Sequence, residues 1–202
     1  VFFDIERFVI GALGDLIESS HMHGEESLKG CEFGTSRQMN EAIVSVFYDL
    51  LIPLSQTGLP VIDVVCVTGN HDRLDKKQTY SRPGENNLTY VIYKQLELLC
   101  KISGLNNVKF HITPKMYAHT DIYGSTVVYE HGHELSNLNR DTMMKMMNKR
   151  QNQIGKIVDF YRVGHWHERV EYGQGKVQVN ASVPGQDDYA EGKGFDSEAL
   201  QI

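Results

Sequence analysis

The chain has 202 residues, a formal net charge of −6 and 41% hydrophobic residues, which is typical of one globular protein with a substantial core. The net acidity argues against a surface devoted to nucleic acid, although it leaves room for a local basic groove or for bound divalent metal. The sequence shows no apolar run of membrane-spanning length and no secretory signal pattern. We therefore expect a cytoplasmic protein without a membrane partner, organised as one domain over residues 1–202.

Cysteine usage supports the same compartment. Cys31, Cys66 and Cys100 are odd in number and widely spaced, which is typical of reduced thiols rather than of a disulfide framework. Cys66 lies in an apolar run, where we expect it to pack inside a strand. Asn87-Leu-Thr and Asn180-Ala-Ser match the glycosylation pattern, but without a secretory signal we discount both.

Apolar runs and helical spacing predict alternating strands and helices. The predicted strands are 8–13, 61–67, 108–112, one within 122–129, 157–163, and a hairpin of 169–172 with 176–179. We expect a first helix capped by Thr35 or Ser36, a second over 88–103, and a third that begins at Asn139 or Asp141. We expect Pro53 to kink or shorten the last turn of the first helix.

The helix that begins near residue 139 has a locally basic composition. Its cationic residues are Lys145, Lys149, Arg150 and, just beyond it, Lys156. A solvated face is the simpler interpretation of these side chains, and a contact with a phosphate backbone is the alternative.

Four predicted strand ends carry polar clusters whose residues are poor candidates for a core. An apolar run precedes each cluster, and glycine lies beside it. The clusters are Asp15, Asn70-His71-Asp72, His131 with His133, and His165 with His167. Because chemistry in open α/β sheets sits just past the carboxyl ends of strands, these positions are candidates for a site. Oxygen and imidazole donors without thiolate suit Mn²⁺, Fe or Zn²⁺ in a catalytic rather than a structural centre.

The spacing of these donors suggests two metals. His165 and His167 are two residues apart, so on an extended strand end both side chains would point the same way. Asp15 has two oxygens and could bridge neighbouring ions. Two metals about 3.5–4 Å apart clamp an in-line displacement at phosphorus and generate a hydroxide nucleophile. His21 and His23 lie in the polar segment 19–34, where solvated loop histidines and a substrate-facing loop are both open interpretations.

The ordered motifs G-D-x-x-E, G-N-H-D, H-G-H and G-H-x-H resemble those of the calcineurin-like metallophosphoesterase superfamily over nearly the whole chain. The resemblance implies an α/β fold in which two mixed sheets form a four-layer α-β-β-α sandwich. It also implies two divalent metal ions, for which we favour Mn²⁺ over Fe or Zn²⁺. The implied metal ligands are Asp15, Asn70, His131, His165 and His167.

The resemblance further implies a role for each matched residue. Asp15 would bridge the metals, and Asn70, His131 and His165 would complete one site, while His167 would belong to the other. The remaining roles fall on residues near these ligands. His71 would be the general acid or transition-state stabiliser, oriented by Asp72, and Arg73 and His133 would contact the substrate. For Arg73, a solvated loop arginine is an equal alternative.

One departure from the family pattern concerns its opening D-x-H motif, which supplies ligands to the second metal. No aspartate in this sequence is followed two places later by histidine. By the family pattern the motif should precede Asp15, and only fourteen residues do so. We therefore expect the first strand to lie upstream, so that the domain is truncated at its N-terminus. The alternative is a protein that has lost one metal site.

The long segment after Asp72 and the ending N-A-S-V-P-G-Q-D-D-Y-A resemble phage or prophage members of the superfamily, near the DNA repair exonucleases. This resemblance implies a phosphodiesterase or nuclease that uses a bridging hydroxide on a phosphodiester substrate such as DNA. The alternative function is a non-catalytic or single-metal binding module in a nucleic-acid complex. A zinc-dependent hydrolase of carbon esters is a third hypothesis.

Overall fold

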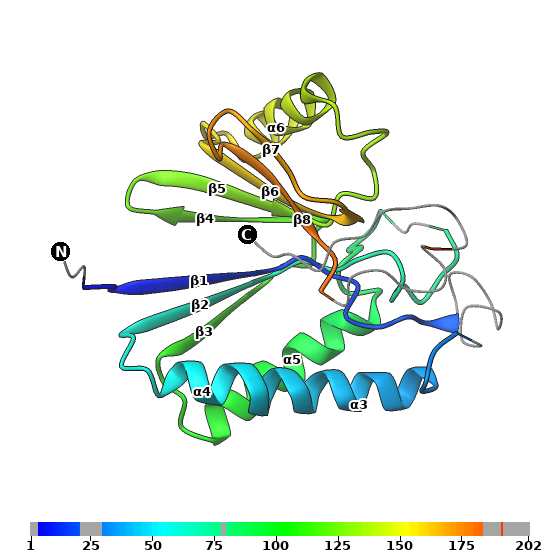
Figure 1. The fold of residues 1–202 in the computed structure, drawn as a ribbon, viewed down its shortest axis with the longest axis vertical. Coiled ribbons are helices and arrows are strands. Elements are labelled where there is room, and N and C mark those ends of the chain that lie inside the picture. The colour runs from blue at the N-terminus through cyan, green and yellow to red at the C-terminus, as the bar shows by residue number, and fades with distance from the viewer. Residues whose placement is uncertain (1–3, 21–29, 78–79, 184–190, 192–202) are drawn as a thin grey trace. The chain divides into compact units, whose positions relative to one another are not determined.

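The computed structural model describes residues 4–20, 30–77, 80–183 and 191 of the chain. It divides into two compact units, Val1–Lys115 and Met116–Ile202, and each contains a sheet and helical structure of its own (Figure 1). His21 and His23 lie outside the described residues, so their role stays a prediction. Among the residues that the structure describes, no helix is long and apolar enough to cross a membrane.

The first unit contains a three-stranded parallel sheet in the order β1-β2-β3. Its strands are β1 (Arg7–Ala12), β2 (Val61–Cys66) and β3 (Val108–Ile112). Each lies within one residue of the predicted strand. β2 has a strand on either side, and all of its residues after Val61 are buried. Its run of mostly apolar and β-branched residues is typical of such a central strand. Cys66 is one of these residues, which confirms that it packs inside a strand.

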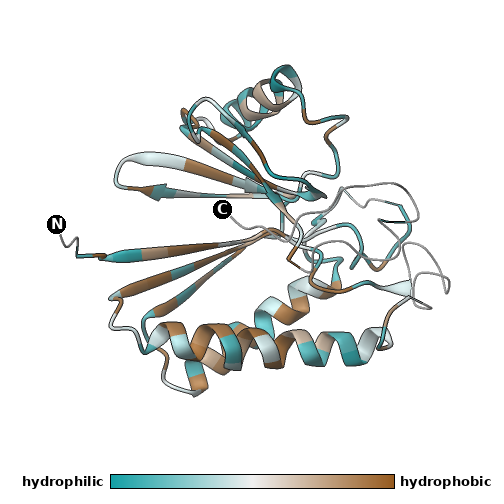
Figure 2. Cartoon of the chain, viewed as in Figure 1, coloured by the Kyte–Doolittle hydropathy of each residue, from teal (hydrophilic) through white to brown (hydrophobic). Residues whose placement is uncertain are grey.

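Amphipathic helices cover one face of this sheet. They are α3 (Thr35–Ser45), the π-helix η1 (Val46–Leu51), α4 (Ile52–Ser55) and α5 (Leu88–Ile102). Phe47, Leu51, Ile92 and Leu96 pack with Val64 of β2 in one core, and Figure 2 shows apolar and polar colours alternating along the helices. Pro53 lacks the N–H that would bond to the preceding turn, so we expected a distorted helix there. The distortion is the π-helix η1, which ends two residues before Pro53.

The second unit contains a five-stranded mixed sheet in the order β4-β5-β6-β8-β7. Its strands are β4 (Tyr117–Ile122), β5 (Ser125–Glu130), β6 (Phe160–His167), β7 (Val170–Tyr172) and β8 (Val177–Ala181). Helix α6 (Arg140–Ile154) begins after the cap Asn139 and packs Met143 and Met147 against Tyr161 and Val163. The antiparallel pair β7–β8 is the predicted hairpin. The expected α/β class, with two sheets and helices, is confirmed.

Asp63 is a buried carboxylate in the middle strand of the first sheet. Its side chain meets Arg7 of β1, with Nε 2.5 Å from Oδ2, and His111 of β3, with Nε2 2.5 Å from Oδ1. Burial opposes ionisation of this group, but the hydrogen bonds from His111 and Arg7 and their charges outweigh it and lower the pKa of Asp63. The carboxylate therefore joins all three strands.

We expect Asp63→Asn to lower the free energy of unfolding by about 2 kcal/mol at pH 7, because hydrogen bonds to a charged group are lost. Since folding lowers the pKa of Asp63, its stabilisation is complete above the unfolded value of about 3.9 and is lost as the pH falls through the folded pKa. Urea unfolding at neutral and acidic pH measures this. Asp121→Asn, at an exposed carboxylate, is the control and should change little. A difference between Asp63→Asn and wild type that stayed constant into strong acid would contradict the prediction.

Candidate functional site

One group of predicted site residues lies where two loops of the first unit meet. Asp15 follows β1, and Asn70 and His71 follow β2. The Asp15 carboxylate oxygen Oδ1 accepts the backbone N–H of Asn70 at 2.8 Å and that of His71 at 2.9 Å. Two convergent donors fix the carboxylate and complement its negative charge. The G-D and G-N-H-D motifs therefore form one structural element.

The glycines of both motifs are required by the close approach of these loops. A Cβ added to Gly14 would lie 2.4 Å from the backbone nitrogen of Gly69, and one added to Gly69 would lie 1.9 Å from Asp15 Oδ1. Gly14 also has a φ of 92°, and Asp15 has a φ of 53°. A left-handed conformation is unfavourable for a residue with a side chain, and such strain concentrates at functional sites.

His71 is held by the segment that follows Asp15. Its Nδ1 lies against the carboxylate of Glu18, while Ser19 donates to the carbonyl oxygen of His71 from both its N–H (3.1 Å) and its hydroxyl (2.6 Å). Burial disfavours the charged imidazole, but the Glu18 hydrogen bond and the charges of Asp15, Glu18 and Asp72 outweigh it and raise the pKa of His71. The arrangement favours an imidazolium whose ring orientation is fixed.

Asp72 connects the G-N-H-D loop to the residues that begin α5, and its expected role in orienting His71 stays a prediction. Its fully buried carboxylate accepts hydrogen bonds from Asn87 Nδ2 at 2.8 Å and from the Thr89 hydroxyl. Asn87 is the N-cap of α5 and also donates to the carbonyl oxygen of Gly69 at 3.1 Å. The carboxylate that contacts His71 is Glu18, and Asp72 joins the G-N-H-D loop to the start of α5.

Two further buried side chains support this loop. Arg73 is 8% exposed, and its Nε donates to the carbonyl oxygen of Asn70 at 3.1 Å. The alternative of a solvated loop arginine is therefore wrong, while contact with a substrate stays a prediction. Tyr93 of α5 places its hydroxyl 3.0 Å from the carbonyl oxygen of Val67 and 3.3 Å from that of Ala12. It thereby joins the ends of β1 and β2.

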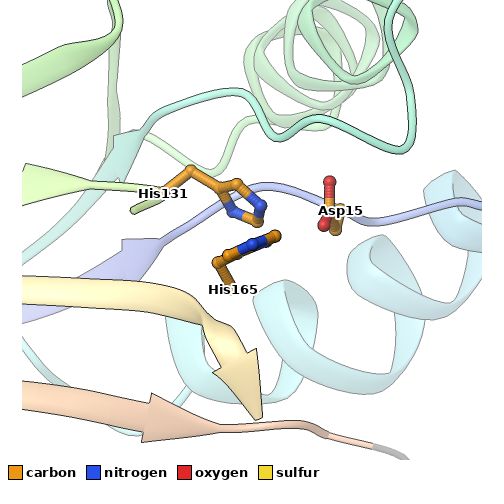
Figure 3. A group of neighbouring side chains, drawn as sticks. All are labelled: Asp15, His131 and His165. Carbon is orange, nitrogen blue, oxygen red and sulfur yellow. The ribbon is translucent and has the colours of Figure 1, made fainter. Parts of the chain in front are cut away.

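A second group of predicted site residues consists of imidazoles in the second unit. His131 directly follows β5 and is 2% exposed, and His165 lies in β6. Ring centroids are 5.0 Å apart for His131 and His165, 5.5 Å for His131 and His133, and 6.2 Å for His133 and His165. Figure 3 draws the rings of His131 and His165, together with Asp15 of the first unit. Clustered imidazole groups are suitable ligands for a transition metal.

The end of β6 is irregular, which changes our expectation for its histidines. Pairing of β6 with β8 shifts register between Val163 and His167, and His165 and His167 have φ values of 72° and 55°. Neither residue is in the extended conformation that we expected. Their spacing of two therefore does not place both rings on the same side of the strand. His167 is exposed, whereas His165 is partly buried.

Backbone contacts hold the imidazole segments together. The N–H of Gly164 donates to the carbonyl oxygen of His131 at 3.0 Å, and Trp166 Nε1 donates to that of Gly132 at 3.3 Å. The Trp166 ring also lies edge-on to His165, with centroids 5.8 Å apart. These contacts place the H-G-H and G-H-x-H motifs side by side within one unit.

A buried charged network lies directly before His131 in the chain. Glu130 is 2% exposed and accepts from Arg150 Nε at 2.8 Å, from Arg150 Nη2 at 2.5 Å and from the Tyr161 hydroxyl at 2.8 Å. Arg150 is 3% exposed, so our interpretation of it as part of a solvated basic face is wrong. The network attaches α6 to β5 and β6 and so supports the position from which His131 projects.

No protein-family model matches the sequence, and no curated protein matches it either. Among solved structures, the chain is similar to Vps29 from Entamoeba histolytica, crystallised with Zn²⁺ (16% identity, 96% of this chain and 79% of that chain, TM-score 0.39). It is also similar to Chaetomium thermophilum Vps29 (12%, 88% and 71%, TM-score 0.41) and to a predicted phosphoesterase from Streptococcus pneumoniae TIGR4 (12%, 88% and 72%, TM-score 0.34). These three similarities have identities of 16% or less and TM-scores below 0.5, so they assign no chemistry to this chain.

The structure thus assembles the predicted residues as two local groups. Asp15, Asn70 and His71 meet in the first unit, and His131, His133 and His165 meet in the second. Two residues of the site had no assigned role beforehand. Glu18 is the last position of G-D-x-x-E, and Asn87 is a capping residue directly before a predicted helix, so both carried a recognisable signal.

Proposed function

We propose that this chain is a metal-dependent phosphoester hydrolase of the calcineurin-like superfamily, and that it acts on phosphodiesters as a phosphodiesterase or nuclease. The observation that carries the proposal is the Asp15 carboxylate, held by the N–H groups of Asn70 and His71. The same loop presents His71 with Glu18 at its Nδ1. A fixed carboxylate ligand beside a charged imidazole is the pair of groups that phosphoester hydrolysis needs.

The donor set fits divalent metal ions. The proposed ligands combine carboxylate, amide and imidazole groups and are Asp15, Asn70, His131, His165 and His167. Such oxygen and nitrogen donors suit Mn²⁺, Fe or Zn²⁺, and we favour Mn²⁺. Glu18 Oε1 is buried and has no hydrogen-bond partner among the described residues, so a bound group is expected to satisfy it. When bound, two such ions would polarise the phosphoryl group and activate water for attack.

The chain's own residues would then orient the His71 ring, donate a proton to the leaving oxygen and contact the substrate. Glu18 holds the Nδ1 side of the His71 ring, which directs Nε2 as the proton donor to the leaving oxygen. Because the pKa of His71 is raised, the charged form of the ring persists above pH 6.5. Arg73 and His133 are the proposed substrate contacts, and DNA is a candidate substrate.

The test is Mn²⁺-dependent hydrolysis of bis-p-nitrophenyl phosphate by wild-type protein and by Asn70→Ala. We expect turnover that EDTA abolishes, and a loss of at least about 100-fold in the variant, because loss of even an outer partner of a metal ligand lowers metal affinity or activity by about 10–100-fold. Asn148→Ala, at an exposed position of α6, is the matched control. Full activity of Asn70→Ala, or activity unaffected by EDTA, would contradict the proposal.

A second candidate is a binding module that holds one metal ion without turnover. The position of His167 favours it: this residue is the one ligand that we assign to the second metal alone, and it is exposed at the irregular end of β6. Calorimetric titration with Mn²⁺ separates the two candidates: a stoichiometry of two with turnover supports the hydrolase, and a stoichiometry of one without turnover supports the binding module.

A further inference from the structure

A pocket of about 320 Å³ lies in the second unit beside the H-G-H motif. One wall is the loop Glu134–Ser136, which begins one residue after His133. The other wall is a face of α6 formed by Thr142, Lys145, Met146 and Lys149. These four residues follow helical spacing, so they form a continuous stripe along the helix. The pocket is therefore built from residues of one unit and adjoins the imidazole group.

The positive charge of the pocket comes from Lys145 and Lys149. Lys145 and Lys149 are exposed, and among the described residues neither forms an ion pair. Other lysines are paired, as Lys94 is with Glu97 and Lys156 with Asp121. The two unpaired ammonium groups lie four residues apart on α6, which corresponds to about 6 Å along the helix axis.

The other lining groups complement a phosphate chain. Ser136 and Thr142 bring hydroxyl groups, while Leu135, which is 5% exposed, and the partly buried Met146 bring apolar surface. Glu134 is the one acidic lining residue, and its carboxylate lies 4.0 Å from Arg150 Nη2, which offsets its charge. Lysine binds phosphate as a point charge, and hydroxyl groups commonly contact phosphate oxygens.

We propose that this pocket binds successive phosphate groups of a single nucleic-acid strand as the strand leads away from the histidines. The inference rests on the proposed function, because it supposes that the hydrolysed phosphodiester lies at His131 and His133. From His131 to Glu134 the chain spans at most about 11 Å between Cα atoms. A strand engaged at the histidines therefore reaches the pocket within a few nucleotides. Contacts to phosphate alone give binding without sequence preference.

The direct test is fluorescence anisotropy of a labelled single-stranded oligonucleotide over a range of salt concentrations in EDTA. We expect the double variant Lys145→Ala/Lys149→Ala to bind about tenfold more weakly. The slope of log K against log salt should also fall by about 1.4, because two phosphate contacts are lost. The matched control is Lys101→Ala/Lys109→Ala, which removes the same charge from a second pocket in the first unit. Equal weakening by both double variants, or no weakening by Lys145→Ala/Lys149→Ala, would overturn the proposal.

Two further measurements separate this inference from the proposed function. Bis-p-nitrophenyl phosphate has a single phosphate group, so it offers no second phosphate to the lysines when that group is at the histidines. Lys145→Ala/Lys149→Ala should therefore hydrolyse it at the wild-type rate, while the KM of the variant for an oligonucleotide rises. If wild-type protein does not hydrolyse the small diester, the proposed catalysis fails, and the anisotropy result still decides the pocket. A phosphopeptide of equal charge that displaces the oligonucleotide as well as unlabelled strand does would overturn the nucleic-acid assignment.

Discussion

His71→Ala is expected to lower kcat for phosphodiester hydrolysis by about 10²–10⁴-fold, because a positioned general acid contributes this much to a proton transfer. The fold should survive, since the two hydrogen bonds from Ser19 go to the carbonyl oxygen of His71, which alanine keeps. The measurement is kcat with saturating Mn²⁺, together with a urea unfolding curve. The matched control is His119→Ala, at an exposed position of β4. Unchanged kcat in His71→Ala would remove this residue from the mechanism.

The pH profile tests the partnership with Glu18. The raised pKa of His71 keeps the proton-donating form populated above pH 6.5, so activity should fall on the alkaline side of that value. Glu18→Gln removes the negative charge that raises this pKa, and the alkaline limb should then move to lower pH. A lower rate with an unshifted limb would indicate that Glu18 has only a structural role.

Gly69→Ala is expected to abolish activity and to destabilise the first unit by roughly 3 kcal/mol, the upper range for a side chain forced into a packed site. The added Cβ would lie 1.9 Å from Asp15 Oδ1 and 2.5 Å from the backbone nitrogen of Asp15, so one of the two loops must move. Either movement breaks the hydrogen bonds that hold the carboxylate. Urea unfolding and the diester assay measure the two effects.

Gly34→Ala provides the control for this substitution. Gly34 has a φ of −67°, and nothing lies within 4 Å of an added Cβ, so alanine should be tolerated there. If Gly69→Ala also retained full stability and activity, the close approach of the two loops would not be needed for function.

Much of the fold could be predicted from the sequence because its elements carry strong local patterns. Strand β3 and the starts of α5 and α6 match the prediction, since a short apolar run and a capping asparagine each act locally. Strand β4 was missed: Tyr117–Ile122 contains three polar residues, and its strand conformation depends on pairing with β5. Such tertiary pairing leaves little trace in a single segment.

In the candidate site, too, some features were predictable and others were not. The glycines before Asp15 and Asn70 indicated the two loops correctly, because a side chain at either glycine would clash with the other loop. The partner of His71 could not be settled in advance, since Asp72 is its neighbour in sequence while Glu18 reaches it through the fold. The left-handed conformations of His165 and His167 could not be predicted from the sequence either, because an irregularity in a strand depends on its register with the neighbouring strand.

Trp166 gives the second unit a built-in optical reporter. It is the one tryptophan of the 202-residue sequence, its ring lies edge-on to His165, and its indole N–H is bonded beside His131. Emission excited in the indole band therefore originates from a single position next to the imidazole group. Ligation of His165 by a metal would alter the surroundings of that one fluorophore, so occupancy could be followed in unlabelled protein, independently of turnover and of any chromogenic substrate.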